Sequence, residues 1–327
     1  MADQFEDRIE RFNEQLGRKG LESFNLKKLS GTKPDLLVVA GMGGSGLAAE
    51  ILQSLTKFVG LKVPLIIWKN YGLPDIRNYG ARKPLYIFVS FSGNTEETIS
   101  GLTEALRSKK LAAVVASGGE LQRMAERRDL PFVIFPPAGL EPRQAPGRMF
   151  YSIIEILRAA NLVSGKDLDC RHLKPLEFRA LGKELAKKLL KRLVLVYSDE
   201  ADRDLGYIWK ITLNETAKTE AFSNIIPEMN HNELVGLSNS HHPTAAIFVH
   251  KNELGPRLKK RISINKKLLK AQGVRIVDHK QDGRNDLERR WNTIMLATWT
   301  AYYMALKEKV DPKEVRIVEK LKELMRK

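Results

Sequence analysis

The sequence predicts an α/β protein made of two tandem αβα domains with mostly parallel sheets. Its 327 residues, 43% of them hydrophobic, suit two domains of ordinary size better than one core. The apolar runs are of strand length and are separated by stretches of helical periodicity. Short apolar strands that alternate with helices are typical of a parallel sheet covered on both faces.

The first element expected is an amphipathic helix over residues 3–20. Phe5, Ile9, Phe12 and Leu16 recur about one helical turn apart. We expect this helix to pack on the first domain.

Strands and helices then alternate through a first domain, predicted to cover residues 1–160. The expected strands span residues 36–40, 65–68, 85–90, 112–116 and 132–135. The expected helices span residues 47–55, 96–108, 120–127 and 148–160.

A polar segment, residues 161–175, separates this domain from a second one over residues 175–327. Its expected strands span residues 193–197, 245–249 and 274–278, and its clearest helices span 202–216, 256–271, 286–308 and 312–325. We interpret the aromatic side chains of the third of these helices as packing. Two similar units in tandem indicate a duplicated architecture, with a ligand crevice expected between them.

Composition excludes several classes of protein. The apolar runs are far shorter than the ~20 residues of a membrane span, and the acidic, amphipathic start does not resemble a signal peptide. We therefore expect a cytoplasmic protein with no membrane partner. The single cysteine, Cys170, cannot form an internal disulfide, and no Cys/His spacing resembles a zinc site.

The formal net charge of +16 results from 55 Lys+Arg against 39 Asp+Glu. These basic residues are spread through helices such as residues 183–191 and 257–270, rather than gathered in one tail. Solvated helix faces explain this distribution better than a nucleic-acid stripe, so we expect no nucleic-acid partner.

A glycine-rich turn at residues 41–46 follows the first strand and formally fits the pattern G-x-G-x-x-G. A nicotinamide site would require an acidic residue at the end of the next strand, which instead reads Trp68-Lys69-Asn70. The sequence therefore disfavours a dehydrogenase. The glycines either let the backbone approach a ligand at a helix start or only make a tight turn.

A stronger signal is the segment SFSGNTEET at residues 90–98, between an apolar strand and a helix. Ser90, Ser92 and Thr95 can donate to phosphate oxygens where free N–H groups and the helix dipole favour an anion. One hydroxyl could simply be an N-cap followed by first-turn acids. Capping leaves the other hydroxyls unexplained, so phosphate binding is favoured.

This segment resembles the signature of the sugar isomerase (SIS) domain, and GMGGSG at residues 41–46 resembles the opening loop of that domain. The resemblance implies two SIS-type domains. It also implies that Ser90, Ser92 and Thr95 hold the phosphate of a phosphosugar, with Gly44 and Ser45 lining the same pocket.

Two further segments, KITLNETAK at residues 210–218 and PEMNHNE at residues 227–233, resemble the bifunctional phosphoglucose/phosphomannose isomerases. The match covers essentially the whole chain. It implies a homodimer with shared active sites, because the ring-opening histidine of this family comes from the neighbouring subunit. The implied catalytic residues are Glu215 as base, His231 for ring opening, Arg143 beside the enediolate and Lys322 at the ring oxygens.

Aldose–ketose isomerisation moves one proton between adjacent carbons, so it needs a carboxylate base, an acid for ring opening and a cation near the enediolate. It requires no metal or redox cofactor. Read singly, Glu215 could be a helix-surface acid and His231 a structural histidine. Their occurrence together with a phosphate loop favours the catalytic interpretation.

A metal site could be built from His231, Glu228 and Glu233, or from the adjacent His241 and His242. Adjacent histidines point apart in an extended chain, and no helical ligand spacing occurs. We expect no metal.

The predicted function is interconversion of glucose 6-phosphate and mannose 6-phosphate with fructose 6-phosphate. The alternatives are another SIS-domain sugar-phosphate isomerase, acting on an amino sugar or a pentose phosphate, and a non-catalytic phosphosugar-sensing module. Such a sensor would carry a DNA-binding region, and too few residues precede the first strand for a helix-turn-helix domain with its linker.

Overall fold

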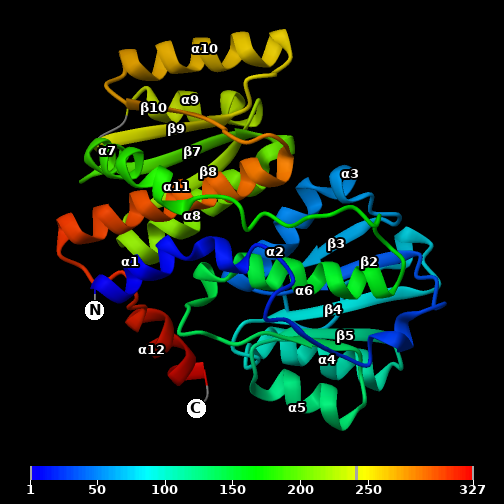
Figure 1. Cartoon of the computed structure of the whole chain (residues 1–327). Coiled ribbons are helices and arrows are strands. Elements are labelled where there is room, and N and C mark those ends of the chain that lie inside the picture. Colours follow the sequence, from blue (N-terminus) through cyan, green and yellow to red (C-terminus); the bar gives the residue numbers. More distant parts are fainter. Residues whose placement is uncertain (1, 240–241, 326–327) are drawn as a thin grey trace. The chain divides into compact units, whose positions relative to one another are not determined.

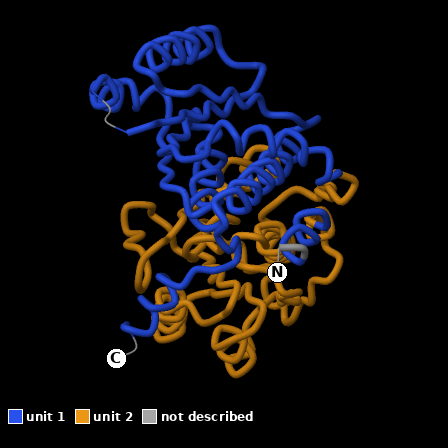
Figure 2. The backbone as a smooth tube through the Cα atoms, turned by 90° about the vertical axis from the view of Figure 1, so that its left-hand side faces the viewer, with its two compact units in different colours: residues 1–11, 174–327 blue, residues 12–173 orange. Residues whose placement is uncertain are grey.

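The computed structural model describes residues 2–239 and 242–325. The chain divides into two compact units, shown in Figure 2. Unit 1 comprises residues 1–11 and 174–327, and unit 2 comprises residues 12–173. Both are α/β units with mostly parallel sheets, as the sequence predicts.

In its described residues, unit 2 holds a six-stranded sheet in the order β1-β6-β5-β4-β2-β3, in which β1 alone is antiparallel. Helices α2 and α6 cover one face, and α4 and α5 cover the other (Figure 1). The strands are β1 (Glu22–Phe24), β2 (Leu36–Ala40), β3 (Leu65–Trp68), β4 (Pro84–Ser90), β5 (Leu111–Ala116) and β6 (Phe132–Ile134). The helices are α2 (Gly43–Ser54), α3 (Thr56–Val59), α4 (Glu96–Arg107), α5 (Gly119–Arg127) and α6 (Pro146–Ala159).

The central strands β2 and β4 are buried along their whole length, which explains why they read as continuous apolar runs. Val38, Phe88 and Val114 point to the face covered by α4 and α5, where they pack with Leu102 and Leu121. This two-sided burial holds the strand ends, and the loops that follow them, in place.

Unit 1 holds, in its described residues, a four-stranded parallel sheet in the order β10-β9-β7-β8. Figure 1 shows α9 and α10 on one face, and α7, α8 and α11 on the other. The strands are β7 (Leu193–Asp199), β8 (Ala221–Ile226), β9 (Thr244–His250) and β10 (Arg275–Lys280). The helices are α1 (Ala2–Glu10), α7 (Arg179–Leu189), α8 (Arg203–Ala217), α9 (Glu233–Leu237), α10 (Pro256–Ala271), α11 (Asp286–Glu308) and α12 (Arg316–Met325).

The two units repeat one topology. The order β5-β4-β2-β3 of unit 2 corresponds, strand for strand along the chain, to β10-β9-β7-β8 of unit 1. The expected duplicated architecture is therefore present in the fold, although the residues themselves show no repeat.

The expectation for the first helix was wrong. Helix α1 ends at Glu10 and packs on α11 of unit 1, where Phe5 and Ile9 contact Trp299 and Tyr302. The chain leaves unit 1 after residue 11, so the apolar periodicity of residues 3–20 is shared between two units and does not mark one continuous helix. The aromatic side chains of α11 are core packing, as expected.

The carboxyl ends of β7 and β9 in unit 1 carry a buried network of charges. The Arg290 guanidinium contacts Asp204 at 2.9 Å and Asp202 at 3.2 Å, and all three side chains are almost fully buried. Lys251, directly after β9, lies 3.4 Å from Asp202, so an ion pair spans the two strand ends. Breaking such a network by removing one partner typically costs ~3–5 kcal/mol.

Candidate active site

The strand order of unit 2 reverses between β2 and β4. Strand β3 continues on the far side of β2, whereas β5 continues on the far side of β4. In an open parallel sheet, ligands bind outside the carboxyl ends of the strands at such a switch point. Strand β2 ends at Ala40 and β4 at Ser90, so the glycine-rich turn and the serine-rich loop both begin there.

The glycine-rich turn packs closely against the segment that carries Arg143. A Cβ atom on Gly44 would lie 2.8 Å from the backbone nitrogen of Arg143, so the approach is possible only for glycine. The Ser45 hydroxyl accepts a hydrogen bond from the Phe91 N–H at 2.9 Å. This bond ties the turn after β2 to the loop after β4.

The predicted phosphate-binding hydroxyls differ in their surroundings. Ser90 is fully buried, and its Oγ accepts from the Gly93 N–H at 3.1 Å and lies 2.8 Å from Thr95 Oγ1. Ser92 is exposed and accepts from the Asn94 N–H at 3.2 Å. Thr95 is the N-cap residue of α4, but its side chain makes no capping hydrogen bond. The capping explanation therefore does not account for Thr95.

The loop that follows β5 braces the serine-rich loop. Gly93 has φ +68°, and a Cβ there would collide with the Gly118 carbonyl oxygen. The Leu121 N–H donates to the Gly93 carbonyl at 2.9 Å, and the Glu120 N–H donates to Asn94 Oδ1 at 3.0 Å. Neither Asn94 nor Gly118 is predicted from the sequence as part of this site, although Asn94 lies within the hydroxyl-rich segment itself.

Arg143 lies in a short 3-10 helix, Pro142–Gln144, and is buried, with only 7% of its surface exposed. Gln144 Oε1 accepts from the Glu141 N–H at 3.0 Å, and Gln15 donates to the Gln144 carbonyl at 2.8 Å. These bonds fix the backbone on both sides of Arg143. Unit 2 thus brings six of the predicted site residues together beyond the carboxyl ends of its central strands. They are Gly44, Ser45, Ser90, Ser92, Thr95 and Arg143.

Glu215 lies in the last turn of α8, in unit 1, and is partly buried. The neighbouring Asn214 side chain accepts from the Ala221 N–H at 2.8 Å and donates to the Ala221 carbonyl at 3.2 Å. Because Ala221 begins β8, this pair of bonds fixes the end of α8, and with it Glu215, at the amino end of that strand.

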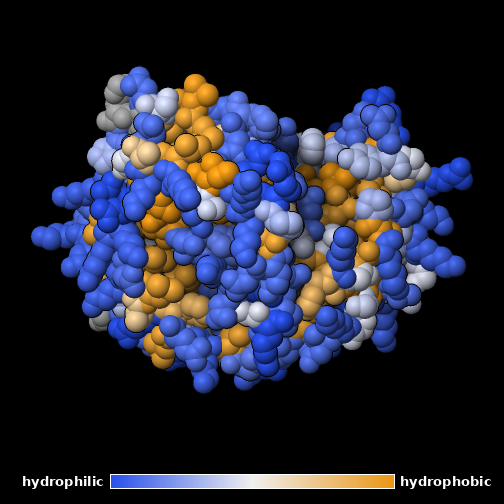
Figure 3. Space-filling view, turned by 90° about the horizontal axis from the view of Figure 1, so that it is seen from above, coloured by the Kyte–Doolittle hydropathy of each residue, from blue (hydrophilic) through white to orange (hydrophobic). Residues whose placement is uncertain are grey.

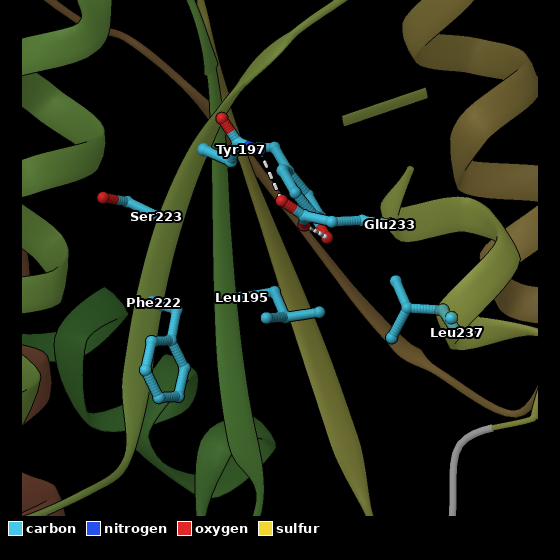
Figure 4. A pocket seen from close by; sticks show the side chains of 8 residues that line it. Leu195, Tyr197, Phe222, Ser223, Glu233 and Leu237 are labelled. Atoms are coloured by element: carbon cyan, nitrogen blue, oxygen red, sulfur yellow. Dashed lines mark hydrogen bonds between the residues drawn. The ribbon is translucent and has the colours of Figure 1, made fainter. Parts of the chain in front are cut away.

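His231 is exposed and ends the 3-10 helix Glu228–His231, which follows β8. On one side of it, Asn230 donates to Asn265 Oδ1 of α10 at 2.7 Å. On the other, the Tyr197 hydroxyl donates to Glu233 at 2.7 Å, drawn as a dashed line in Figure 4. Burial and the Glu233 carboxylate raise the pKa of Tyr197, so it remains a hydrogen-bond donor. The segment around His231 is thus held at two points.

Glu215 and His231 do not meet within unit 1. The six residues of β8 separate them, because Glu215 lies at its amino end and His231 beyond its carboxyl end. At ~3.3 Å per residue, the two ends of this strand are about 17 Å apart.

Lys322 lies on α12, where it pairs with Glu319 at 2.7 Å, and both side chains are 58% exposed. No residue of α12 that the structure describes is buried.

Among the described residues, no group of three or more His, Cys, Asp or Glu side chains could hold a metal ion. Of the histidines considered as ligands, His241 lies outside the described residues. No helix within residues 2–239 and 242–325 is long and apolar enough to cross a membrane.

The fold and these loops define a class of protein: α/β proteins with two units of one parallel topology, one of which carries glycine- and serine-rich loops at its switch point. Residues 178–325 match the family described as the bacterial phospho-glucose isomerase C-terminal SIS domain. The fold is also that of the tagatose-6-phosphate ketose/aldose isomerase of Escherichia coli, with a TM-score of 0.68, 14% identity and 96% of each chain covered.

Two curated relatives identify the family. The bifunctional phosphoglucose/phosphomannose isomerase of Aquifex aeolicus is 30% identical over 89% of this chain and 90% of its own length. The enzyme of the same name from Thermoplasma volcanium is 29% identical over 89% of this chain and 91% of its own. The chain belongs to the bifunctional phosphoglucose/phosphomannose isomerase family, as the sequence motifs indicate.

Proposed function

We propose that this chain interconverts glucose 6-phosphate and mannose 6-phosphate with fructose 6-phosphate, by metal-free proton transfer through a cis-enediol. The observation that carries the proposal is the cluster of hydroxyl groups at the switch point of unit 2, in a chain of this family. The cluster supports the binding of a phosphate group, and membership of the family supports the isomerisation reaction.

The phosphate group is bound by the serine-rich loop. The hydroxyls of Ser92 and Thr95 and the first N–H groups of α4 donate to its oxygens, because the Thr95 side chain does not cap that helix. Ser90 supports the phosphate site from the interior of the unit, because its buried hydroxyl is hydrogen-bonded to Thr95 and to the Gly93 N–H and so holds both residues in place. Gly44 and Ser45 line the same pocket.

Proton transfer is assigned to Glu215, which takes the proton from one carbon and returns it to the next. Arg143 stabilises the negative charge that develops on the enediolate oxygens. Lys322 assists at the ring oxygens, and His231 opens the ring. One base serves both epimers if the sugar rotates about its C2–C3 bond.

We also propose a homodimer in which each active site takes His231 from the neighbouring subunit. The length of β8 supports this arrangement, because it separates Glu215 from His231 within one chain.

The decisive experiment is a Glu215→Gln variant assayed with each hexose 6-phosphate, with and without a chelator. Glutamine keeps the shape of the side chain and removes its basicity, so we expect turnover to fall by at least ~10²-fold with both epimers. Affinity for a phosphosugar acid inhibitor should change little. The matched control is Glu220→Gln, an exposed carboxylate just beyond α8, which should retain full turnover.

A folded Glu215→Gln enzyme with most of its turnover would show that another group abstracts the proton. A wild-type chain that binds hexose 6-phosphates without converting them would support the sensing module instead.

A further inference from the structure

A second pocket of unit 2 lies at the edge of the sheet opposite the serine-rich loop. It has a volume of about 530 Å³ and is formed by the carboxyl-terminal ends of α4 and α5, which lie side by side on one face of the sheet (Figure 1). Arg107 ends α4 just before β5 begins, and Arg127 ends α5 just before β6 begins. Helix α4 starts after the serine-rich loop and is 12 residues long, so about 18 Å separates this pocket from the predicted phosphate site.

Three arginine side chains line this pocket, and its described lining contains no carboxylate. They are Arg107, Arg127 and Arg128, and all three are exposed. Arg127 is paired with Glu120, whereas neither Arg107 nor Arg128 forms an ion pair with any residue that the structure describes. Like charges around one cavity repel each other, so their convergence is unfavourable until an anion lies between them.

The dipoles of the two helices account for only part of this arrangement. A basic side chain in the last turn of a helix is stabilised by the free carbonyl groups there, which would explain Arg107 and Arg127 one at a time. The dipoles do not require that side chains from two helices meet around one cavity. Nor do they require Arg128, the C-cap residue of α5, which adds a second cation to the same helix end.

The remaining lining residues indicate what kind of anion fits. Leu106 and Met124 are partly buried and give the pocket an apolar side, and the Thr103 hydroxyl is already bonded to the Ile99 carbonyl at 2.8 Å. The polar contacts to a ligand are therefore left to guanidinium groups, whose paired N–H donors match phosphate oxygens. The volume lies within the usual range for a site that binds a small organic molecule, and it exceeds the size of a single phosphate.

We propose that the pocket between the carboxyl-terminal ends of α4 and α5 binds an anion that carries two or more phosphate groups. Arg107 and Arg128 approach the anion from two helices, so each guanidinium pairs with a phosphate group of its own. Inorganic polyphosphates and nucleoside polyphosphates share this chemistry. A nucleoside would in addition place its base against Leu106 and Met124.

The test measures the binding of tripolyphosphate and of adenosine triphosphate to the whole chain by isothermal titration calorimetry. We expect one site per chain for each probe. Arg107→Gln combined with Arg128→Gln removes the two cations that have no acidic partner, and it should raise both dissociation constants on the order of 100-fold. Both side chains are exposed, so the core is not disturbed.

The matched control removes two positive charges from another part of the chain. Lys259 and Lys267 are exposed on α10, and Figure 3, which looks onto this helix, shows many hydrophilic side chains on this side of unit 1. Lys259→Gln combined with Lys267→Gln lowers the net charge equally. At about 0.1 M salt, charges farther apart than ~10 Å are screened, so this control should bind both probes with wild-type affinity. Circular dichroism checks the folding of all variants.

The two sources of the ligand are separated by Met124→Gln, which changes the apolar side of the pocket and leaves the arginines in place. If adenosine triphosphate binds more tightly than tripolyphosphate and Met124→Gln weakens only the nucleotide, the ligand is a nucleoside polyphosphate. If the two probes bind equally and Met124→Gln changes neither, the ligand is an inorganic polyphosphate.

A wild type that binds neither probe would overturn the inference. Equal weakening by the lysine control would also do so, because the probes would then respond only to the net charge. Displacement of tripolyphosphate by glucose 6-phosphate, or its loss in the Ser92→Ala/Thr95→Ala variant, would place the anion at the serine-rich loop instead. Because the measurement is of binding and requires no turnover, failure of the proposed isomerase activity would leave this result unaffected.

Discussion

Gly93 is the residue on which the shape of the serine-rich loop depends most. Its φ of +68° lies in the region that favours glycine, and its Cα faces the Gly118 carbonyl oxygen across a gap too small for a methyl group. Sequence reasoning identified the hydroxyls of this loop because they are local. It could not identify the brace, because Gly118 is brought to Gly93 only by the pairing of β4 with β5.

We predict that Gly93→Ala pushes the serine-rich loop away from the loop that follows β5. Gly80→Ala is the control, since Gly80 has φ +61° but no described atom lies within 4 Å of its added Cβ. The left-handed backbone alone should cost about 1–2 kcal/mol in both variants. Gly93→Ala should lose clearly more stability in chemical unfolding and bind phosphosugar more weakly. Equal losses in the two variants would contradict the brace.

A second residue-scale prediction concerns the exposed donors. Ser92→Ala combined with Thr95→Ala removes two proposed phosphate donors whose hydroxyls otherwise contact only Asn94 and Ser90 of the same loop, so KM should rise by roughly 10- to 100-fold while kcat changes far less. Thr103→Ala, farther along α4, is the control because its hydroxyl bonds only the Ile99 carbonyl. An unchanged KM in the double variant would remove these residues from the phosphate site.

Strand β8 is an element that the periodicity of the sequence does not predict. Sequence analysis predicted the other three strands of unit 1 and missed this one, because Ser223 and Asn224 interrupt its apolar pattern. As an edge strand, β8 is covered less completely and needs no continuous apolar run. For this reason the sequence alone does not show that Glu215 and His231 lie at opposite ends of β8.

Helix α8 and strand β10 meet at a buried histidine that makes stability depend on pH. His279 accepts a hydrogen bond from Trp209 Nε1 through Nδ1 at 3.2 Å, so the bonded form is neutral. Burial, assisted by the nearby His250, lowers the pKa of His279 to about 4. An unfolded histidine titrates near ~6.5. The stabilising contribution is therefore complete above that pH and is lost as the pH falls towards 4.

We predict that the free energy of unfolding falls by roughly 2 kcal/mol between pH 7.5 and pH 5 through His279 alone. His279→Gln keeps an acceptor for the indole N–H and removes the titration, so its stability should change less over this range. Urea unfolding at the two pH values measures the difference. Identical pH dependence in the two proteins would exclude His279 as the cause.

For the whole molecule, the proposed sharing of active sites predicts complementation between inactive chains. A mixture of Glu215→Gln and His231→Ala subunits that have exchanged contains sites with both native residues, so part of the activity should return. The control mixes Glu215→Gln with the Glu215→Gln/His231→Ala double variant, which can form no complete site. If labelled subunits exchange and the first mixture stays inactive, the shared site is wrong.

The ion pairs of Arg290, Asp202 and Lys251 set the end of the unit 1 sheet apart from its counterpart in unit 2. They lie beyond the carboxyl ends of β7 and β9, at the position where unit 2 places its glycine- and serine-rich loops. The two repeats therefore use the same topological position differently, for internal charge pairing in unit 1 and for the proposed phosphate site in unit 2. Loops exchanged between the repeats would not be equivalent, because a graft after β7 would remove Asp202 and leave Arg290 without one of its partners, and a graft after β9 would remove Lys251 and leave Asp202 without one of its own.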